Sequence, residues 1–350
     1  MRPLKFAIIA ALWCVSALLS AQTRNDHAQC AKCHPAQAKL EPLTPMGRAL
    51  ELPGTNPVLA KHPSLKFQNG RYTYTVETRG NKTTYSVTDG TRTIALPVLW
   101  GFGAAAQTWV LEHDGKLYES LVSYYPDIND LYFTTGDEKL VANSLEDAIG
   151  RELSANESKT CFGCHSTNAI VNGKLDVSSL KPGVTCEHCH IGAIAHMSDI
   201  PKGITATIPP RLADLSTEDL SNFCGQCHRT WETVVRNHWF GPVNVRFQPY
   251  RLANSKCFNG TDPRISCLAC HDPHQQVVRD DSYYDAKCQA CHAAPAHAPP
   301  ALAASSVPSC PVAKSNCVSC HMPKVKLPNG HLTFTDHQIR VVRAGESYPN

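Results

Sequence analysis

The 350-residue sequence has little of what marks a membrane protein or a nucleic-acid-binding protein. Its one long apolar run, from Phe6 to Leu19, has about 14 residues, fewer than the ~20 that a membrane-spanning helix needs. No cluster of basic residues is interleaved with aromatic ones, and the formal net charge is only +3. We therefore expect no nucleic-acid partner.

The N-terminal segment has the layout of a secretory signal peptide. Arg2 and Lys5 precede the apolar run, and the small residues Ser20 and Ala21 follow it. This order predicts a signal peptide over residues 1–21, with cleavage after Ala21. The mature protein is then expected to be exported, to the periplasm or to the extracellular cell surface, with no transmembrane segment after signal removal.

The dominant motif is the pentapeptide Cys-x-x-Cys-His, which occurs seven times. With 17 Cys and 17 His in the chain, random order predicts roughly 0.04 matches. The cysteine pairs are Cys30 and Cys33, Cys161 and Cys164, Cys186 and Cys189, Cys224 and Cys227, Cys267 and Cys270, Cys288 and Cys291, and Cys317 and Cys320. The histidines that complete the motifs are His34, His165, His190, His228, His271, His292 and His321.

This spacing suits covalent attachment of haem. Two thiols separated by two residues can each form a thioether with one haem vinyl group, and the adjoining histidine then reaches the iron as an axial ligand. Paired Cys-x-x-Cys units also build zinc sites, but zinc gives no reason for a histidine after every second cysteine. A thioredoxin-like dithiol would need one motif beside a βαβ pattern. The sequence predicts seven covalently attached c-type haems, each with its iron.

A low-spin haem needs a second axial ligand, and ten histidines lie outside the motif ends: His27, His62, His113, His188, His196, His238, His274, His297, His331 and His337. This supply favours bis-His coordination over open iron sites. His196 and His274 are too close to the histidines of their own motifs to reach round the same ring, so each is expected to ligate a neighbouring haem. For His27, His113 and His188 an ordinary surface or core role is favoured.

The motifs are unevenly distributed, which predicts the domain organisation. After the signal peptide, we expect a first haem segment at 22–65, a haem-free β-module at 66–135, a six-haem cytochrome domain at 136–343 and a tail at 344–350. The alternation of β-forming residues in Arg71–Thr78, Thr83–Thr88, Thr93–Trp100, Thr108–Leu111 and Lys116–Tyr124 supports the module.

The expected fold class is a multihaem cytochrome c made mainly of short α-helices and loops packed around haems. In this interpretation the small antiparallel β-module is an insertion after the first haem. Ser216 to Cys224 begins with Ser and Thr and carries acidic residues in its first turn, so it predicts a helix that delivers the fourth motif.

Several segments resemble the bacterial multihaem cytochromes with doubled Cys-x-x-Cys-His motifs, which include the tetrahaem cytochromes of the hydroxylamine pathway and haem modules fused to tetratricopeptide repeats. The segments are Thr44–Arg48, Gly183–His190, Val245–Leu252 with Cys257, Cys267–His274, Asn316–Pro323, and His331 with Thr335–Ile339. The resemblance implies electron transfer, with His196, His274, His331 and His337 as distal ligands; His238 is a further candidate. Where related sequences often carry histidine beside the first haem, this chain offers Met46. The sixth ligand there is Met46, His62 or none.

Outside the motifs and the predicted signal peptide, which contains Cys14, two cysteines remain, Cys257 and Cys310. We expect a disulfide between them, with two free thiols as the alternative. The predicted function is a non-catalytic relay of single electrons between redox partner proteins, such as quinol-linked proteins or other cytochromes. One alternative is an oxidoreductase acting on a small nitrogen or sulfur compound at a five-coordinate haem, although no Cys-x-x-Cys-Lys variant is present. The other is self-assembly into an extracellular haem filament.

Overall fold

The computed structural model describes residues 25–104, 106–292, 310–328 and 330–349. The chain divides into two compact units. The first runs to Pro210 and includes His274–Gln276, and the second comprises Arg211–Pro273 and the chain from Val277 onward. The predicted signal peptide, residues 1–21, and His297 lie outside the described residues.

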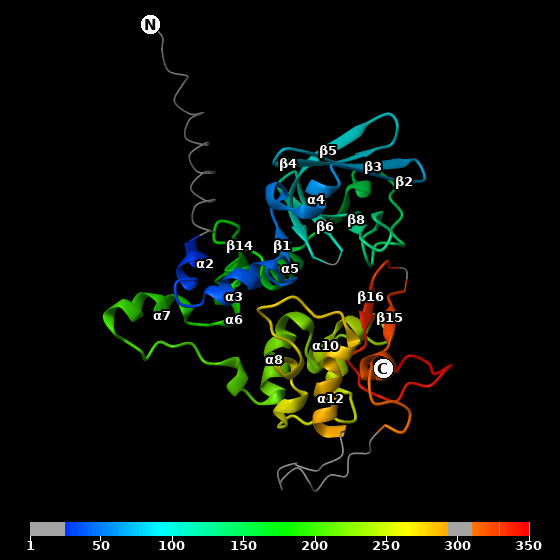
Figure 1. Ribbon diagram of the computed structural model, residues 1–350. Coiled ribbons are helices and arrows are strands. Elements are labelled where there is room, and N and C mark those ends of the chain that lie inside the picture. The colour runs from blue at the N-terminus through cyan, green and yellow to red at the C-terminus, as the bar shows by residue number, and fades with distance from the viewer. Residues whose placement is uncertain (1–24, 105, 293–309, 329, 350) are drawn as a thin grey trace. The chain divides into compact units, whose positions relative to one another are not determined.

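An eight-stranded sheet organises the first unit (Figure 1). Every pairing in it is antiparallel. Across the sheet, the strands are β10 (Gly150–Glu152), β7 (Lys116–Ser120), β6 (Thr108–His113), β5 (Thr93–Phe102), β4 (Lys82–Thr88), β3 (Tyr72–Arg79) and β2 (Ser64–Asn69), and β1 (Leu50–Glu51) pairs with β5 off this path.

The residue pattern explains the strands. Alternate side chains of β3 and β4 are buried, among them Tyr74, Val76, Tyr85 and Val87, so one face of the sheet lies on the core. Tight turns at Gly70 and Gly80, whose φ angles are 57° and 60°, connect β2 to β3 and β3 to β4. The predicted strands from Arg71 to Leu111 are confirmed, apart from small shifts in their ends.

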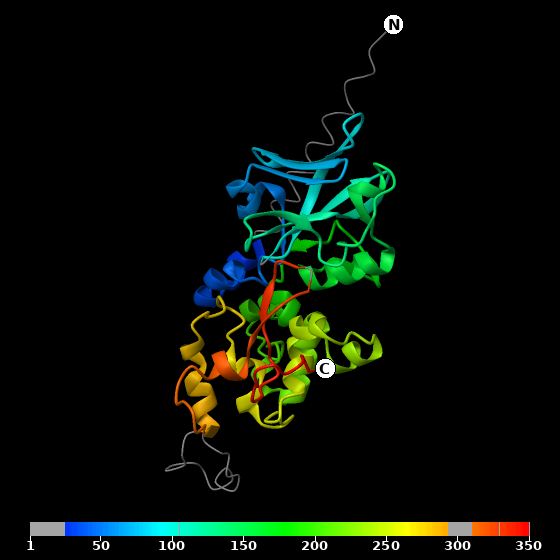
Figure 2. The same ribbon diagram turned by 90° about the vertical axis from the view of Figure 1, so that its right-hand side faces the viewer.

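Further short elements complete the first unit, and Figure 2 shows it from a second side. The hairpin of β8 (Val122–Tyr125) and β9 (Asp130–Phe133) contributes Val122, Tyr124 and Leu131 to the core. Two-stranded pairs form between β11 (Ser166–Thr167) and β14 (Lys181–Pro182), and between β12 (Ile170–Val171) and β13 (Lys174–Leu175). The helices are α2 (Asn25–Cys30), α3 (Pro35–Leu40), α4 (Pro57–Lys61), α5 (Ala155–His165), α6 (Cys186–Cys189) and α7 (Ala193–Asp199).

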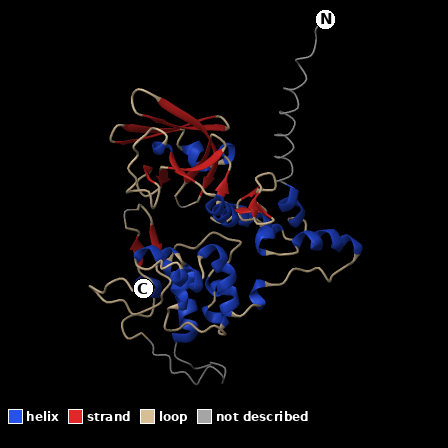
Figure 3. Ribbon diagram, turned by 180° about the vertical axis from the view of Figure 1, so that it is seen from behind, coloured by secondary structure: helices blue, strands red, loops and turns tan. Residues whose placement is uncertain are grey.

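The second unit is built mostly from short helices, whereas the large sheet belongs to the first (Figure 3). Its helices are α8 (Thr217–His228), α9 (Trp231–Arg236), α10 (Gln248–Ala253), α11 (Cys267–Cys270), α12 (Asp285–His292) and α13 (Cys317–His321), joined by the hairpin of β15 (Lys324–Lys326) and β16 (Thr333–Thr335). Its hydrophobic cluster is centred on Val234, Phe247 and Tyr250. Within the described ranges, no helix is both long and apolar enough to span a membrane.

The predicted fold class is wrong in its emphasis. The protein is not mainly short helices and loops with a small β-module, because antiparallel β-structure is substantial and carries the largest buried core. The sheet takes in Leu50–Glu51, which pairs with Gly101 and Phe102, and Gly150–Glu152, which pairs with Tyr118 to Ser120. Strands of two or three residues show no alternation of their own, so only their partners define them.

Candidate functional site

Each Cys-x-x-Cys-His motif forms a single helical turn. The third, fifth, sixth and seventh motifs occupy the short helices α6, α11, α12 and α13, and the second and fourth occupy the last turns of α5 and α8. In the first motif, Cys30 ends α2 and the backbone N–H of His34 donates to the carbonyl of Cys30 over 2.8 Å. A turn of this kind places both thiols and the imidazole on one side of the backbone, as thioether attachment and axial ligation require.

Local sequence explains why the fourth motif is helical. Ser216 caps α8, where its hydroxyl accepts a hydrogen bond from the backbone N–H of Asp219 over 3.0 Å. Glu218 and Asp219 lie in the first turn, where acidic side chains interact favourably with the helix dipole. The predicted helix that delivers this motif is confirmed.

No disulfide joins any two of the cysteines that the structure describes, so disulfide formation does not prevent their thiols from attaching to haem. The expected disulfide between Cys257 and Cys310 is therefore not formed. Cys257 lies instead near the sixth motif, where Cys288 and Cys291 contribute to the raised pKa of its thiol after the main effect of burial. The side chain of Cys310 hydrogen-bonds to the backbone at Val312 and Ala313. The even number of cysteines outside the motifs suggested a disulfide, but that number says nothing about how close the two residues lie in space.

Thiols of different motifs meet in three places. The thiols of Cys30 in the first motif and Cys186 in the third are hydrogen-bonded, and the pKa of Cys186 is raised mainly by burial. The thiol of Cys224 in the fourth motif is hydrogen-bonded to that of Cys267 in the fifth, and the thiol of Cys288 in the sixth to that of Cys317 in the seventh. Motifs one and three in the first unit, and four with five and six with seven in the second, are therefore neighbours.

Two pairs of imidazoles have the spacing of opposite axial ligands. His190 and His274 have ring centroids 6.0 Å apart and planes at 9°, and His271 and His337 have centroids 6.2 Å apart and planes at 44°. A first-row metal ion lies about 2.0 Å from a histidine nitrogen, which places two imidazoles on opposite sides of one ion with centroids about 6 Å apart. The residues present thus fit an iron bound between each pair.

Hydrogen bonds at Nδ1 leave Nε2 of several histidines available. The Nδ1 atoms of His165, His321 and His337 lie 2.9, 2.8 and 3.0 Å from the carbonyl oxygens of Ala49, Arg340 and Thr335, in that order. A carbonyl only accepts, so Nδ1 carries the proton and Nε2 bears the lone pair that a metal needs. This pattern is usual for metal-ligating histidines.

Burial favours the neutral, ligating form of four imidazoles, those of His190, His228, His271 and His337. Burial, with a smaller contribution from the nearby His271, lowers the pKa of His337 to about 4. Burial is also the main reason that the pKa values of His190, His228 and His271 fall below their ordinary value. His190 is influenced in addition by His274 and His34, which is consistent with the closeness of the first and third motifs.

The second motif is anchored to the large sheet. Phe162, fully buried within the motif, packs edge-to-face against Trp100 and Phe102 with centroid distances of 5.0 Å in both cases. The ring of His165 also lies edge-on to Phe102, at 5.1 Å. The sheet is therefore part of the surroundings of this motif, which the prediction of a haem-free module did not anticipate.

The other predicted ligands are found in varied places. Nε2 of His62 lies 3.0 Å from the hydroxyl of Tyr124, so this imidazole already has a partner inside the first unit. Nδ1 of His196, on α7, is buried without a hydrogen-bond partner. His238 is exposed, with φ of 54° and its ring 6.0 Å from Phe240, and His331 is half-buried.

Met46, one of the predicted ligands of the first haem, is half-buried, and its carbonyl accepts a hydrogen bond from the backbone N–H of Val184 over 3.0 Å. The structure also reveals residues beside the motifs that the sequence analysis missed. The sulfur of Met197 lies 3.9 Å from the thiol sulfur of Cys30 in the first motif. Glu41 is buried close to the thiols of the third motif, and burial raises its pKa to about 7. These residues have no regular spacing from the motifs, so only the tertiary contacts identify them.

Among the described residues, no group of three or more His, Cys, Asp or Glu side chains is arranged to hold a metal ion directly. The zinc alternative requires such a group. The haem interpretation does not, since each iron would take at most two protein ligands.

Comparison with known proteins found a family match over part of the chain and a similar solved structure. The family described as cytochrome c554 and c-prime matches residues 134–191, which contain the second and third motifs. No curated protein matches the chain. Among solved structures, one titled "Crystal Structure of Outer Cell Wall Cytochrome OcwA" is similar with a TM-score of 0.48 and 14% identity, over 90% of this chain and 79% of that one. The family match supports a multihaem c-type cytochrome with covalently bound haem c that transfers electrons.

Proposed function

We propose that this protein is an exported seven-haem c-type cytochrome that relays single electrons between redox partners. The observation that carries the proposal is the pairing of His190 with His274 and of His271 with His337. Each pair joins a motif histidine to a histidine from outside the motifs. Such pairs would hold an iron from both sides and leave no open position for a substrate at these two sites, which favours an electron carrier over an enzyme.

The protein would hold seven haems through the fourteen motif cysteines and the seven motif histidines named above. When bound, each haem iron accepts and donates one electron. His274 and His337 are the distal ligands that face motif histidines; His196, His238 and His331 are proposed for others, and Met46 or His62 for the first haem. Burial lowers the pKa values of His190 and His337, which favours the neutral imidazole that can bind iron.

The contacts between motifs suggest the order of transfer within each unit. The contact of Cys30 with Cys186 brings the first and third haem sites together. In the second unit, the fourth and fifth sites meet through Cys224 and Cys267, and the sixth and seventh through Cys288 and Cys317. Cys288 also influences the thiol of Cys270, which brings the fifth site close to the sixth. We propose a chain of sites, four to seven, along which electrons pass.

Haem loading is tested by the intact mass of the exported protein. We expect a chain processed after Ala21 plus seven haems, all resistant to acid–acetone extraction. Replacing Cys317 and Cys320 by alanine should leave six haems. Cys257→Ala is the matched control and should retain seven, because this cysteine is outside every motif. A zinc-loaded protein, or haem released on extraction, would contradict the proposal.

The relay itself is tested by adding carbon monoxide to the reduced protein. Six-coordinate irons with two protein ligands resist this ligand, so the absorption spectrum should not change. Binding at one haem would support the alternative, an oxidoreductase with a five-coordinate site. A low-spin spectrum that turns partly high-spin on dilution would instead indicate a ligand supplied by a second copy, as in a filament.

A further inference from the structure

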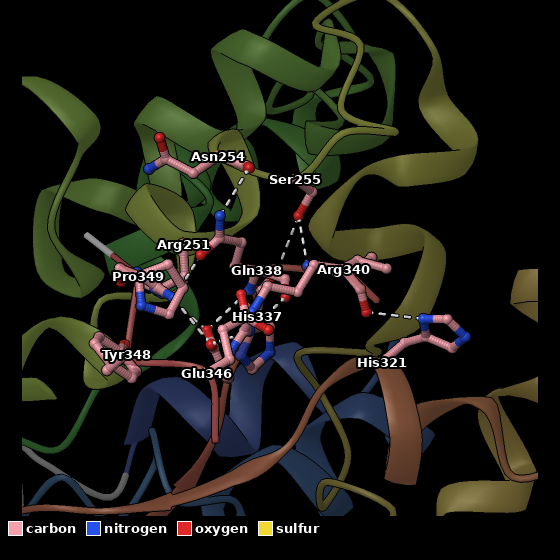
Figure 4. A network of polar contacts seen from close by, with 12 residues as sticks. Arg251, Asn254, Ser255, His321, His337, Gln338, Arg340, Glu346, Tyr348 and Pro349 are labelled. Carbon is pink, nitrogen blue, oxygen red and sulfur yellow. Dashed lines mark hydrogen bonds and ion pairs between the residues drawn. The ribbon is translucent and has the colours of Figure 1, made fainter. Parts of the chain in front are cut away.

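A fully buried ion pair lies at the centre of the second unit. Arg251, from α10, contacts Asp336 through two parallel hydrogen bonds of 2.8 and 2.9 Å, and neither side chain is exposed (0% for both). The two residues are far apart in the sequence. Figure 4 shows the polar network around this arginine.

All five N–H donors of Arg251 have acceptors. Besides Asp336, the guanidinium donates to Gln338 Oε1 over 2.6 Å, to Asn244 Oδ1 over 3.3 Å and to the carbonyl oxygen of Pro349 over 2.8 Å. The ring of Tyr348 lies against the guanidinium, 4.6 Å from its carbon. A buried charge with every donor used is held in one orientation, and such a network specifies geometry more than it adds stability.

Asp336 is equally constrained. Its carboxylate also accepts from the backbone N–H of Gln338 over 3.0 Å and from Arg340 Nη1 over 2.7 Å. Burial alone would raise the pKa of this carboxyl, but the hydrogen bonds from Arg251 and Gln338 outweigh it and lower the pKa. The carboxylate therefore stays ionised and fixes the backbone on both sides of it.

The segment held in this way carries His337. Nδ1 of His337 donates to the carbonyl of Thr335, two residues back, and the carbonyl of His337 accepts from Ser255 Oγ over 3.2 Å. The same hydroxyl accepts from the backbone N–H of Ile339 over 2.8 Å. With the backbone fixed at both ends, the imidazole faces His271 of the fifth motif at 6.2 Å.

The same segment also reaches the seventh motif. The carbonyl of Arg340 accepts from Nδ1 of His321 over 2.8 Å, and the backbone N–H of Arg340 donates to the carbonyl of His321 over 3.2 Å. The side chain of Arg340 is itself bound to Asp336. One short segment, residues 335–340, thus touches the distal ligand of one haem site and the proximal ligand of another.

We propose that Arg251 and Asp336 are positioning residues that hold segment 335–340 so that His337 ligates the fifth haem and Arg340 orients His321 at the seventh. This inference rests on the proposed function, since it assigns the ligand set of two haems. It goes beyond that function because it makes the coordination of two sites depend on one ion pair that touches neither iron.

The test removes the pair without leaving a buried charge. In Arg251→Met with Asp336→Leu, apolar side chains of similar size replace both partners, a change that folded proteins often tolerate. We expect seven haems by mass and unchanged far-ultraviolet circular dichroism. We also expect one high-spin ferric haem by electron paramagnetic resonance, and a second haem with a raised potential because His321 loses its acceptor.

Three further variants keep the outcome interpretable. His337→Ala should give the same high-spin signal; if it does not, His337 is not a ligand and the proposed ligand set fails, independently of the ion pair. The surface pair Arg92 and Glu146, exposed by 63% and 52%, is the matched control: Arg92→Met with Glu146→Leu should change no spectrum.

A double variant at Arg251 and Asp336 with a parental spectrum and parental potentials would overturn the proposal. If that double variant does not fold, Arg251→Lys, which keeps the charge but loses the paired hydrogen bonds, must give the high-spin signal.

Discussion

The imidazoles of His190 and His274 face one another at 6.0 Å, although a long stretch of the chain separates them. His190 completes the third motif, whereas His274 follows the fifth motif by three residues. A histidine that follows one motif therefore lies against the histidine that completes another, as the proposed ligand set requires.

Replacing His274 by alanine should convert one haem from low to high spin. The variant removes one of two facing imidazoles, while every thioether cysteine remains, so the haem count should stay at seven. Electron paramagnetic resonance and intact mass measure the two quantities. His113→Ala is the control, because His113 lies at the end of β6, beside Asp114 and Tyr118, and belongs to no motif. An unchanged low-spin spectrum in His274→Ala would remove this residue from the ligand set.

Replacing Phe162 by alanine should strongly destabilise the first unit. The side chain is fully buried between Trp100 and Phe102, and its loss removes both buried area and two aromatic contacts. Changes of this kind cost about 3–5 kcal/mol in the free energy of unfolding. Urea unfolding followed by circular dichroism measures it. Phe240→Ala, at a side chain that is 42% exposed, should cost far less. Equal effects would show that the second motif is not anchored through this residue.

Asp137 should make the first unit less stable as the pH rises from about 4 to about 6. Burial, assisted by Glu119, raises the pKa of this carboxyl from 3.8 to about 6. As the pH rises, the carboxyl of Asp137 therefore loses its proton in the unfolded state before it does so in the folded state. The free energy of unfolding falls over this interval by on the order of 3 kcal/mol. Asp137→Asn should remove this part of the pH dependence. The control substitution Asp127→Asn, at an exposed residue, should leave the pH dependence unchanged. Parallel stability curves for parent and Asp137→Asn would contradict the assignment.

Met46→Ala should abolish a near-infrared methionine–iron band and lower the highest potential of the protein, because a thioether ligand favours the ferrous state. Two variants serve as comparisons. His62→Phe should keep the band, since Nε2 of His62 is bonded to Tyr124. Met197→Ala tests the sulfur that lies 3.9 Å from Cys30. Loss of the band in Met197→Ala alone would assign the ligand to Met197.

Local signals predicted local structure well. The alternating residues of β3 and β4 and the Ser216 cap of α8 are recognisable in the sequence, because each depends on neighbours within one strand or one helical turn. The extent of the sheet was not predictable in this way. Leu50–Glu51 and Gly150–Glu152 are strands only because β5 and β7 offer them hydrogen-bonding edges.

The sequence by itself determines the motifs of the proposed haem sites, because two thiols and an imidazole within five residues meet in one helical turn. Which histidine pairs with which motif depends on the tertiary structure. The approach of His274 to His190, of His337 to His271 and of Arg251 to Asp336, like the separation of Cys257 from Cys310, results from segments distant in the sequence packing together. Spacing along a chain limits what can meet locally, but distance in space between remote segments is set by the packing of the whole unit.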